Sequence, residues 1–275
     1  MMENEILFRK GSYMQPTLTF IEDIAREAGA ILRAGYRTNY EVRHKAEKDL
    51  VTEIDEQSET LIIGRIREVF PDHKIIAEES GLSDGTGEHC WFIDPLDGTL
   101  NYAHGLPGFS VSIAYAYGGE MQLGLVYNPM LDACYTAQRG QGAWLNGEPI
   151  RVSAQSELAE SLLVASISRE PGLKDGPSSS IGLFTAFNEL GQSARRLGGA
   201  ALNQCYVAAG QADGYWVKRL KAWDVAAGTL IASEAGAVVT DLHGNADFFK
   251  PPYCLLIANP VLHGVMLEVL KGQGV

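Results

Sequence analysis

The order of helical and strand-like patterns constrains the fold of this chain more than any other feature of its sequence. Two helical patterns come first, at residues 16–37 and 51–70, and short strand patterns follow up to residue 166. From residue 181 onward helices and strands alternate, and a helix over residues 260–271 ends the series. Elements mixed in this way predict an α/β protein built from packed layers of helix and sheet.

The strand patterns in the middle of the chain predict antiparallel pairing. Apolar runs at residues 110–117 and 121–127 flank the dipeptide Gly118-Gly119, which is typical of a tight hairpin turn. Shorter apolar runs at 133–137 and 143–145 continue the series. We therefore expect a meander of neighbouring strands in one sheet.

The length of the chain is sufficient for one large domain. It has 275 residues, of which 46% are hydrophobic, and this supports a full core. We expect a single domain over residues 14–275, with an approximate N-terminal half at 14–155 and a C-terminal half at 156–275. Residues 1–13 lack helical periodicity, and we expect them to be a disordered N-terminal extension.

Charge and apolar patterning exclude several classes of function. The net charge is −12, with 34 acidic against 22 basic residues, and no basic stripe is present to neutralise nucleic-acid phosphates. No apolar run of about 18 residues occurs, so we expect no membrane span. The N-terminus lacks the apolar core of a secretory signal. Four scattered cysteines permit three disulfide pairings, but a reduced, cytoplasmic chain is the favoured interpretation.

The most informative motif is a pair of aspartates that follows the apolar residues 91–93. Asp94 and Asp97 lie three residues apart. Pro95 fixes its own φ angle, whereas Gly98 permits a backbone conformation that other residues rarely adopt. Both carboxylates can therefore point to one side of a strand end. The residues after Gly98 are expected to open a short helix whose free N–H groups can hold a phosphate. An Asp-rich turn with capping roles is the structural alternative.

Other acidic positions follow a similar pattern. Glu78 and Glu79 come directly after an apolar run, and Asp224 opens a segment rich in alanine and glycine. Each of them alone is compatible with an ordinary surface or helix-capping role, as is Asp55 near the start of the second helix. Acidic side chains are rarely buried unless they are paired or bind a metal, and oxygen ligands suit Mg²⁺. Together they predict a Mg²⁺-dependent enzyme that acts on a phosphate.

Taken in order, these segments resemble the inositol monophosphatase family of Mg²⁺-dependent, Li⁺-sensitive phosphatases. The matching segments are residues 49–55, 78–80, 91–101, 196–201 and 223–228, and the resemblance spans residues 16–271. It implies a layered α-β-α-β-α sandwich of the inositol monophosphatase and fructose bisphosphatase type. It also implies a homodimer, since members of the family are commonly dimeric.

The resemblance implies a role for each matching position. Two to three Mg²⁺ ions are expected, for which Mn²⁺ can substitute, and their ligands would be Glu78, Asp94, the carbonyl oxygen of Leu96, Asp97 and Asp224. The implied catalytic residues, which orient and deprotonate the attacking water, are Asp55, Thr99 and Glu78. The implied substrate-binding residues are Gly98, Thr99, Gly199, Ala200 and Lys45.

The expected reaction is hydrolysis of a small phosphate monoester by metal-activated water, with inositol monophosphate as the first candidate substrate. Inositol-selective members of the family carry a glutamate seven residues before the last metal-binding aspartate, and here that residue is Val217. A fructose 1,6-bisphosphatase or a broad sugar-phosphate phosphatase is therefore the alternative, in which Arg219 or Lys221 meets a second anionic group. An alternative from another class is a non-catalytic regulator that binds a metal or phosphate.

Overall fold

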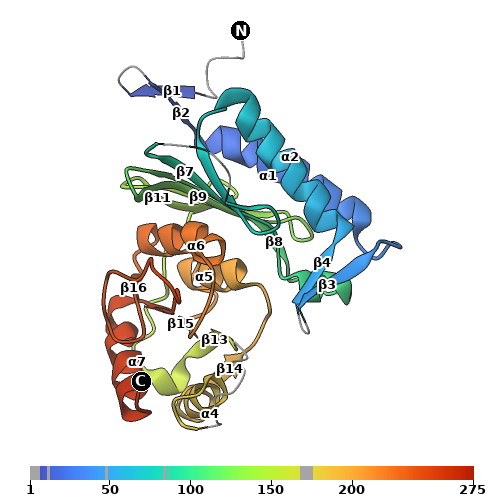
Figure 1. Ribbon diagram of the computed structural model, residues 1–275. Coiled ribbons are helices and arrows are strands. Elements are labelled where there is room, and N and C mark those ends of the chain that lie inside the picture. The colour runs from blue at the N-terminus through green and yellow to red at the C-terminus, as the bar shows by residue number, and fades with distance from the viewer. Residues whose placement is uncertain (1–6, 11–12, 47–48, 83–84, 86, 168–175) are drawn as a thin grey trace.

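The chain folds into five alternating layers of helix and sheet. The structure is a computed structural model that describes residues 7–10, 13–46, 49–82, 85, 87–167 and 176–275. In Figure 1 helices cover one face of a large sheet, further helices lie between it and a smaller sheet, and others cover the far side of the smaller sheet. The helices are α1 (Leu18–Gly35), α2 (Glu53–Val69), α3 (Thr99–Ala103), α4 (Ser180–Leu190), α5 (Ala200–Ala208), α6 (Ala222–Glu234) and α7 (Pro260–Gly272), with a 3₁₀ turn η1 (Leu158–Glu160). This arrangement confirms the predicted α-β-α-β-α sandwich.

The larger sheet carries most of the predicted meander. Its strand order is β12 (Glu148–Pro149), β11 (Gly142–Leu145), β10 (Ala133–Gln138), β9 (Glu120–Asn128), β8 (Ser110–Tyr117), β7 (His89–Asp97), β5 (Lys74–Ala77) and β6 (Gly81–Leu82). Neighbours are antiparallel except β5 and β7, which are parallel. Strands β8 and β9 form the predicted hairpin, and Gly118 and Gly119 both adopt the positive φ that its turn requires.

The smaller sheet mixes parallel and antiparallel neighbours. Its strand order is β14 (Ser193–Arg195), β13 (Leu162–Ser166), β15 (Gly214–Val217), β17 (Leu255–Ala258) and β16 (Val238–Thr240). Strand β13 is parallel to β14 and β15, whereas β17 is antiparallel to both of its neighbours. The helices that connect these strands lie on both faces of the sheet, as the alternating pattern of the sequence predicts.

Two short hairpins lie outside the two sheets of the sandwich. Strand β1 (Leu7–Lys10) pairs with β2 (Tyr13–Pro16), and residues 1–6 and 11–12 of the expected N-terminal extension lie outside the described part. Strand β3 (Val42–Ala46) pairs with β4 (Asp49–Thr52), where the helical pattern was expected to begin. The physical reason is the cap: the Thr52 hydroxyl accepts the N–H groups of Ile54 and Asp55, so α2 begins only after it.

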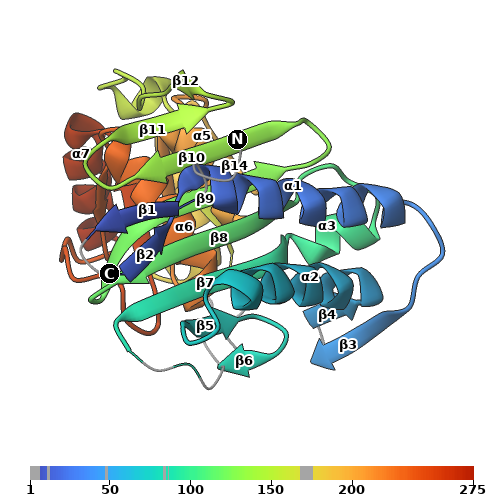
Figure 2. The same cartoon turned by 90° about the horizontal axis from the view of Figure 1, so that it is seen from above.

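Three apolar cores fill the interfaces between the five layers. One core joins α1 and α2 to the larger sheet, the second joins both sheets to α5 and α6, and the third joins the smaller sheet to α4 and α7. Figure 2 shows α1 and α2 lying over the larger sheet, roughly along the direction of its strands. Because strand side chains alternate, Trp91 and Ile93 face the first core while Phe92 faces the second. The apolar run at 91–93 is thus buried on both faces.

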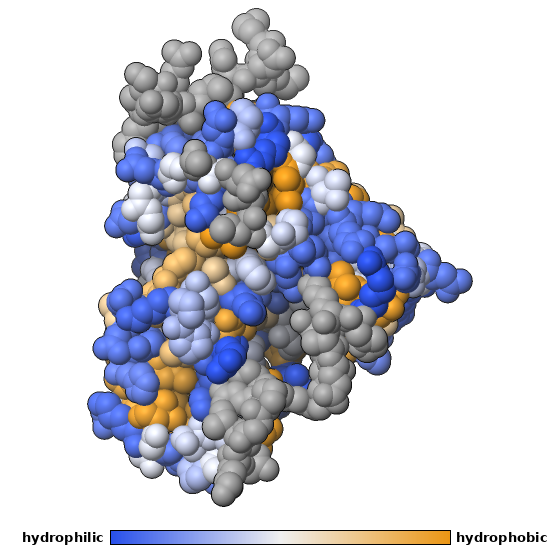
Figure 3. All heavy atoms as spheres, in the orientation of Figure 1, coloured by the Kyte–Doolittle hydropathy of each residue, from blue (hydrophilic) through white to orange (hydrophobic). Residues whose placement is uncertain are grey.

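The surface of the protein carries hydrophobic as well as hydrophilic residues. On the face drawn in Figure 3, hydrophobic and hydrophilic areas are interspersed. Within the described part of the chain, none of the helices combines the length and apolar character needed to cross a bilayer.

Gly64 offers a simple test of the helix energetics. It lies in the interior of α2, it is exposed, and a Cβ atom added there would meet nothing within 4 Å. Since glycine costs roughly 0.5–1 kcal/mol relative to alanine inside a helix, Gly64→Ala is expected to raise the free energy of unfolding by about that amount. Urea denaturation monitored by circular dichroism measures it. An unchanged or lower midpoint would contradict the prediction.

Two histidine rings stack at the side of the larger sheet. The ring centroids of His73 and His89 are 4.2 Å apart with 3° between the planes, and Phe70 stacks on His73 at 4.7 Å. The Trp91 indole N–H donates to Nδ1 of His73 at 3.1 Å. Burial, and then the neighbouring His89, lower the pKa of His73 to about 4, and burial also lowers the pKa of His89. The fold therefore holds these imidazoles in their neutral form.

This stack predicts a loss of stability in mild acid. Because the pKa of His73 falls from 6.5 to about 4 on folding, the unfolded chain takes up the proton first. The His73 contribution is complete above pH 6.5 and decreases as the pH falls toward 4, with a slope of at most about 1.4 kcal/mol per pH unit. Urea unfolding of wild type and His73→Phe between pH 7.5 and 4.5 measures the difference. Parallel pH curves for the two proteins would refute this account.

Candidate active site

The acidic positions of the sequence meet where several elements end or begin. Strands β5 and β7 are parallel, so their carboxyl ends lie at the same edge of the sheet, with Ala77 opposite Ile93. Glu78 follows β5, and its N–H donates to the Ile93 carbonyl at 3.1 Å, directly before Asp94. The first turns of α2, α5 and α6 also bring residues to this region, because Asp55, Ala200 and Asp224 all interact with its side chains.

A β-bulge turns the two aspartates of β7 to the same side. Asp94 pairs with Ser112 and Asp97 pairs with Ser110, so three residue steps on β7 match two on β8. In a regular strand residues i and i+3 face opposite sides, and the one extra residue removes this alternation. Pro95 lies within the bulge, where the loss of its N–H costs no ladder hydrogen bond. This geometry explains how a spacing of three gives one shared site.

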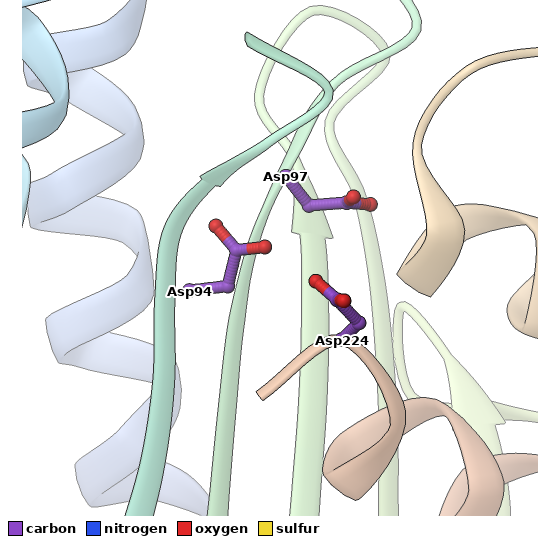
Figure 4. A group of neighbouring side chains, drawn as sticks. All are labelled: Asp94, Asp97 and Asp224. Carbon is purple, nitrogen blue, oxygen red and sulfur yellow. The ribbon is translucent and has the colours of Figure 1, made fainter. Parts of the chain in front are cut away.

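Three carboxylates form the centre of the site. One oxygen atom from each of Asp94, Asp97 and Asp224 lies within 4.8 Å of the others, as Figure 4 illustrates. Asp94 and Asp97 are buried, with 1% and 5% of their surface exposed, and Asp224 is partly buried. Buried carboxylates this close together are costly unless they share protons or bind a cation. The donor set, composed of oxygen atoms alone, suits a hard divalent cation such as Mg²⁺.

The electrostatics of the cluster agree with a cation site. Burial, followed by repulsion from Glu78, Asp97 and Asp224, raises the pKa of Asp94 well above its usual range. Burial also raises the pKa of Asp97 to about 6, and burial with repulsion from Asp97 raises the pKa of Asp224. All three shifts indicate negative charge in excess of what the surrounding protein compensates. A bound divalent cation removes this penalty.

The N-terminal ends of two helices compensate part of the negative charge of the carboxylate cluster. The carboxylate of Asp97 accepts the N–H groups of Ala200 at 2.8 Å and Ala201 at 2.9 Å, in the first turn of α5. Asp224 accepts the N–H of Lys221 at 2.7 Å and so caps the α6 helix to which it belongs. Because the N-terminal end of a helix carries partial positive charge, both carboxylates sit in favourable positions. Asp224 therefore caps α6 and also belongs to the carboxylate cluster.

The predicted pair of Thr99 and Asp55 contacts the segment between Asp94 and Asp97 through the Leu96 carbonyl oxygen. The Thr99 hydroxyl is 3.3 Å from Oδ1 of Asp55 and 3.1 Å from the carbonyl oxygen of Leu96. The other oxygen of Asp55 accepts the N–H of Thr52 at 2.9 Å and its hydroxyl at 2.5 Å. The cap of α2 therefore fixes the Asp55 carboxylate while leaving Oδ1 directed at Thr99. Leu96 is buried, but its carbonyl oxygen reaches the same hydroxyl.

The remaining predicted residues include Glu78, Gly98, Gly199 and Lys45, and they differ in how they relate to the carboxylate cluster. Glu78 lies near enough to raise the pKa of all three aspartates, but its carboxylate is not within the 4.8 Å group. Gly98 adopts a φ of 91° as the N-cap of α3. A Cβ on Gly199 would come within 2.7 Å of Oδ2 of Asp97, so this glycine permits the close approach. Lys45 belongs to β3, and its side chain lies outside what the structure describes.

Two residues of the site were not found by reasoning from the sequence. Ser58 and Glu59 are buried on α2; Ser58 binds the backbone within the bulge of β7, and Glu59 binds the backbone that follows β5. Their spacing from Asp55, at i+3 and i+4, was the available signal, because it places all three on one helix face. A cleft of about 430 Å³ also lies beside Gly98 and Thr99, and its other lining residues are Leu50, Leu100, Asn101, Leu106, Arg196, Leu197 and Gly198.

Five alternating layers and a buried carboxylate cluster define an α/β protein with side chains that could hold a divalent cation. A model of the inositol monophosphatase family matches residues 13–273, so the chain belongs to that family and is a phosphatase. The chain is 39% identical over 263 residues to the Nus factor SuhB of Pasteurella multocida, covering 93% of this chain and 96% of that protein. It is 38% identical over 261 residues to the fructose-1,6-bisphosphatase/inositol-1-monophosphatase of Thermotoga maritima, covering 92% and 95%. The crystal structure of the extragenic suppressor protein SuhB from Bartonella henselae superimposes with a TM-score of 0.88 at 34% identity, covering 92% and 98%.

Proposed function

We propose that the chain hydrolyses a small phosphate monoester, with inositol monophosphate as the first candidate, in a reaction that depends on Mg²⁺. One observation carries the proposal: three carboxylates cluster, and Thr99, two residues after Asp97, pairs with Asp55 through its hydroxyl. Asp94, Asp97 and Asp224 would hold the metal, with Glu78 and the carbonyl oxygen of Leu96 completing the ligand set. The name of the Thermotoga maritima relative supports a substrate of this kind.

The bound cation would neutralise the carboxylates, polarise the phosphoryl oxygens and lower the pKa of water. The contribution of the protein's own residues is to place water and phosphate. A water molecule next to Thr99 can donate its proton toward Oγ1 while the hydroxyl donates to Oδ1 of Asp55, 3.3 Å away. The N–H groups of Gly98 and Thr99 would hold phosphoryl oxygens. Attack by the water in line with the leaving group forms one P–O bond and breaks the P–O bond to the alkoxide. The alkoxide takes up one proton, so the products are inorganic phosphate and an alcohol, without a covalent intermediate.

The end of β15 bears on the choice of substrate. Val217 is fully buried there and belongs to the core between the two sheets, so it offers no acceptor to the hydroxyl groups of a polyol. Arg219 and Lys221 follow it and are exposed, whereas Lys218 donates to the carbonyl oxygen of Ser178 at 3.0 Å. Exposed cations next to Asp224 support the second candidate, a fructose bisphosphatase or broad sugar-phosphate phosphatase, because they can meet a second phosphate group.

Phosphate release from a panel of substrates tests the proposal. The panel holds inositol 1-phosphate, fructose 1,6-bisphosphate, histidinol phosphate and a 3′,5′-bisphosphorylated nucleotide, each assayed with Mg²⁺ and with a chelator. We expect turnover only with Mg²⁺, and the ratio of kcat/KM values for the first two substrates decides between the two candidates. Turnover that persists in the chelator would refute the metal-dependent mechanism. Magnesium binding without turnover of any member would favour the non-catalytic regulator.

A further inference from the structure

One face of α2 connects three separate parts of the proposed metal centre. Asp55, Ser58 and Glu59 are spaced at i, i+3 and i+4, so the helix places their side chains on the same side. All three are buried, and Glu59 is only 4% exposed. Asp55 reaches Thr99, as described above, and the Ser58 hydroxyl donates to the carbonyl oxygen of Pro95 at 3.0 Å, within the bulge between Asp94 and Asp97. A buried polar face of this kind requires an explanation, because burying a carboxylate is costly.

Glu59 binds the backbone directly after Glu78. Its two carboxylate oxygens accept the N–H groups of Glu79 and Ser80, each at 2.8 Å. Hydrogen bonds to an ionised acceptor are short and about twice as strong as neutral ones, and two parallel bonds also fix orientation. The preceding peptide is fixed from the other side, because the Glu78 N–H donates to Ile93 of β7. The backbone around Glu78 is therefore held both by the sheet and by α2.

These contacts fix the position of the Glu78 Cα atom and the direction of its side chain. Glu78 directly follows β5 and donates its N–H to the carbonyl of Ile93, the residue before Asp94. Its carboxylate repels all three aspartates of the cluster. If the peptides of Glu79 and Ser80 rotate, the Cα–Cβ direction of Glu78 changes with them. Groups that hold metal ligands from outside the ligand set typically affect metal affinity by about 10–100-fold.

We propose that Glu59 is a positioning residue of the metal centre, which holds the peptides of Glu79 and Ser80 and thereby fixes Glu78 against the carboxylate cluster. It acts through Glu78 and touches neither the cation nor the substrate. This inference rests on the proposed function only in that Glu78 is taken to be a metal ligand.

The test is Mg²⁺ binding measured by titration calorimetry on Glu59→Gln, with Glu68→Gln as the matched control. Glu68 lies on the same helix, is exposed and interacts with Arg65, so its substitution makes the same change of charge away from the site. Glutamine matches glutamate in shape but can accept only one of the two N–H groups. We expect the Mg²⁺ affinity to fall about 10-fold in Glu59→Gln, and kcat to recover at saturating Mg²⁺. The control should bind like the wild type.

A double-mutant cycle with Glu78→Gln separates positioning from general destabilisation. If Glu59 acts through Glu78, the additional loss of Mg²⁺ affinity caused by Glu59→Gln should vanish in the Glu78→Gln background. An equal loss in both backgrounds, or no loss in the folded single variant, would overturn the proposal while leaving the proposed function intact. Failure of the wild type to bind Mg²⁺ would instead refute the metal centre itself. Thermal unfolding in a chelator verifies that each variant is folded.

Discussion

Replacement of Asp94 by asparagine is expected to reduce kcat by about 10²–10³-fold or more at saturating substrate and Mg²⁺. Asp94 is the carboxylate that Glu78, Asp97 and Asp224 all repel, and it is almost completely buried. Asparagine has nearly the same shape, and its carbonyl oxygen can still accept the Leu96 N–H that lies 3.0 Å from Oδ1. The substitution therefore removes a charge with little change in packing. Steady-state phosphate release over a Mg²⁺ titration measures the loss.

The same variant should be more stable than the wild type without metal. Since the aspartates repel one another, removal of one charge is expected to raise the free energy of unfolding in a chelator by about 1 kcal/mol. Added Mg²⁺ should then raise the melting temperature of the wild type more than that of Asp94→Asn. Asp247→Asn provides a matched control, because Asp247 is exposed and pairs with Lys250. Normal activity in Asp94→Asn would refute the proposed site, whatever its stability.

The sequence predicted the parts of the fold that depend on local pattern. The helix at residues 260–271 and the hairpin at Gly118-Gly119 follow from local pattern and turn chemistry, and both are present. The start of α2 was placed too early, because the apolar pattern does not reveal that the Thr52 cap ends a strand. Boundaries of this kind are set by individual hydrogen bonds rather than by periodicity.

The composition of the site was partly predictable, but its geometry was not. Resemblance to a family pointed to Asp94, Asp97 and Asp224, which the structure brings together. No local signal showed that β5 and β7 are parallel, or that a bulge turns Asp97 to the side of Asp94. Glu59 was missed because a buried glutamate on a helix has the same sequence pattern as an exposed one. These features depend on contacts between segments far apart in the chain.

The close packing of α6 against the larger sheet affects the spacing of the carboxylates in the candidate site. Gly124 on β9 faces Ala227 of α6, and a Cβ atom on Gly124 would lie 2.9 Å from the carbonyl oxygen and 3.2 Å from the Cα of Ala227. Both are backbone atoms, so no side chain can move aside to make room. Asp224 is one helical turn before Ala227, whereas Asp94 and Asp97 belong to the sheet. The distance between α6 and the sheet therefore sets the size of the carboxylate cluster.

Gly124→Val is accordingly expected to impair stability and metal binding together. Overpacking of a well-packed core costs about 1–3 kcal/mol, and we expect the upper end of that range because the contact is with backbone. Displacement of α6 should also move Asp224 from Asp94 and weaken Mg²⁺ binding about 10-fold or more. Urea unfolding and titration calorimetry measure the two effects, with Gly124→Ala as an intermediate step. Gly264→Val is the control, because a Cβ at this exposed position of α7 meets nothing within 4 Å. Wild-type Mg²⁺ affinity in a folded but destabilised Gly124→Val protein would show that the cluster does not depend on how closely α6 approaches the sheet.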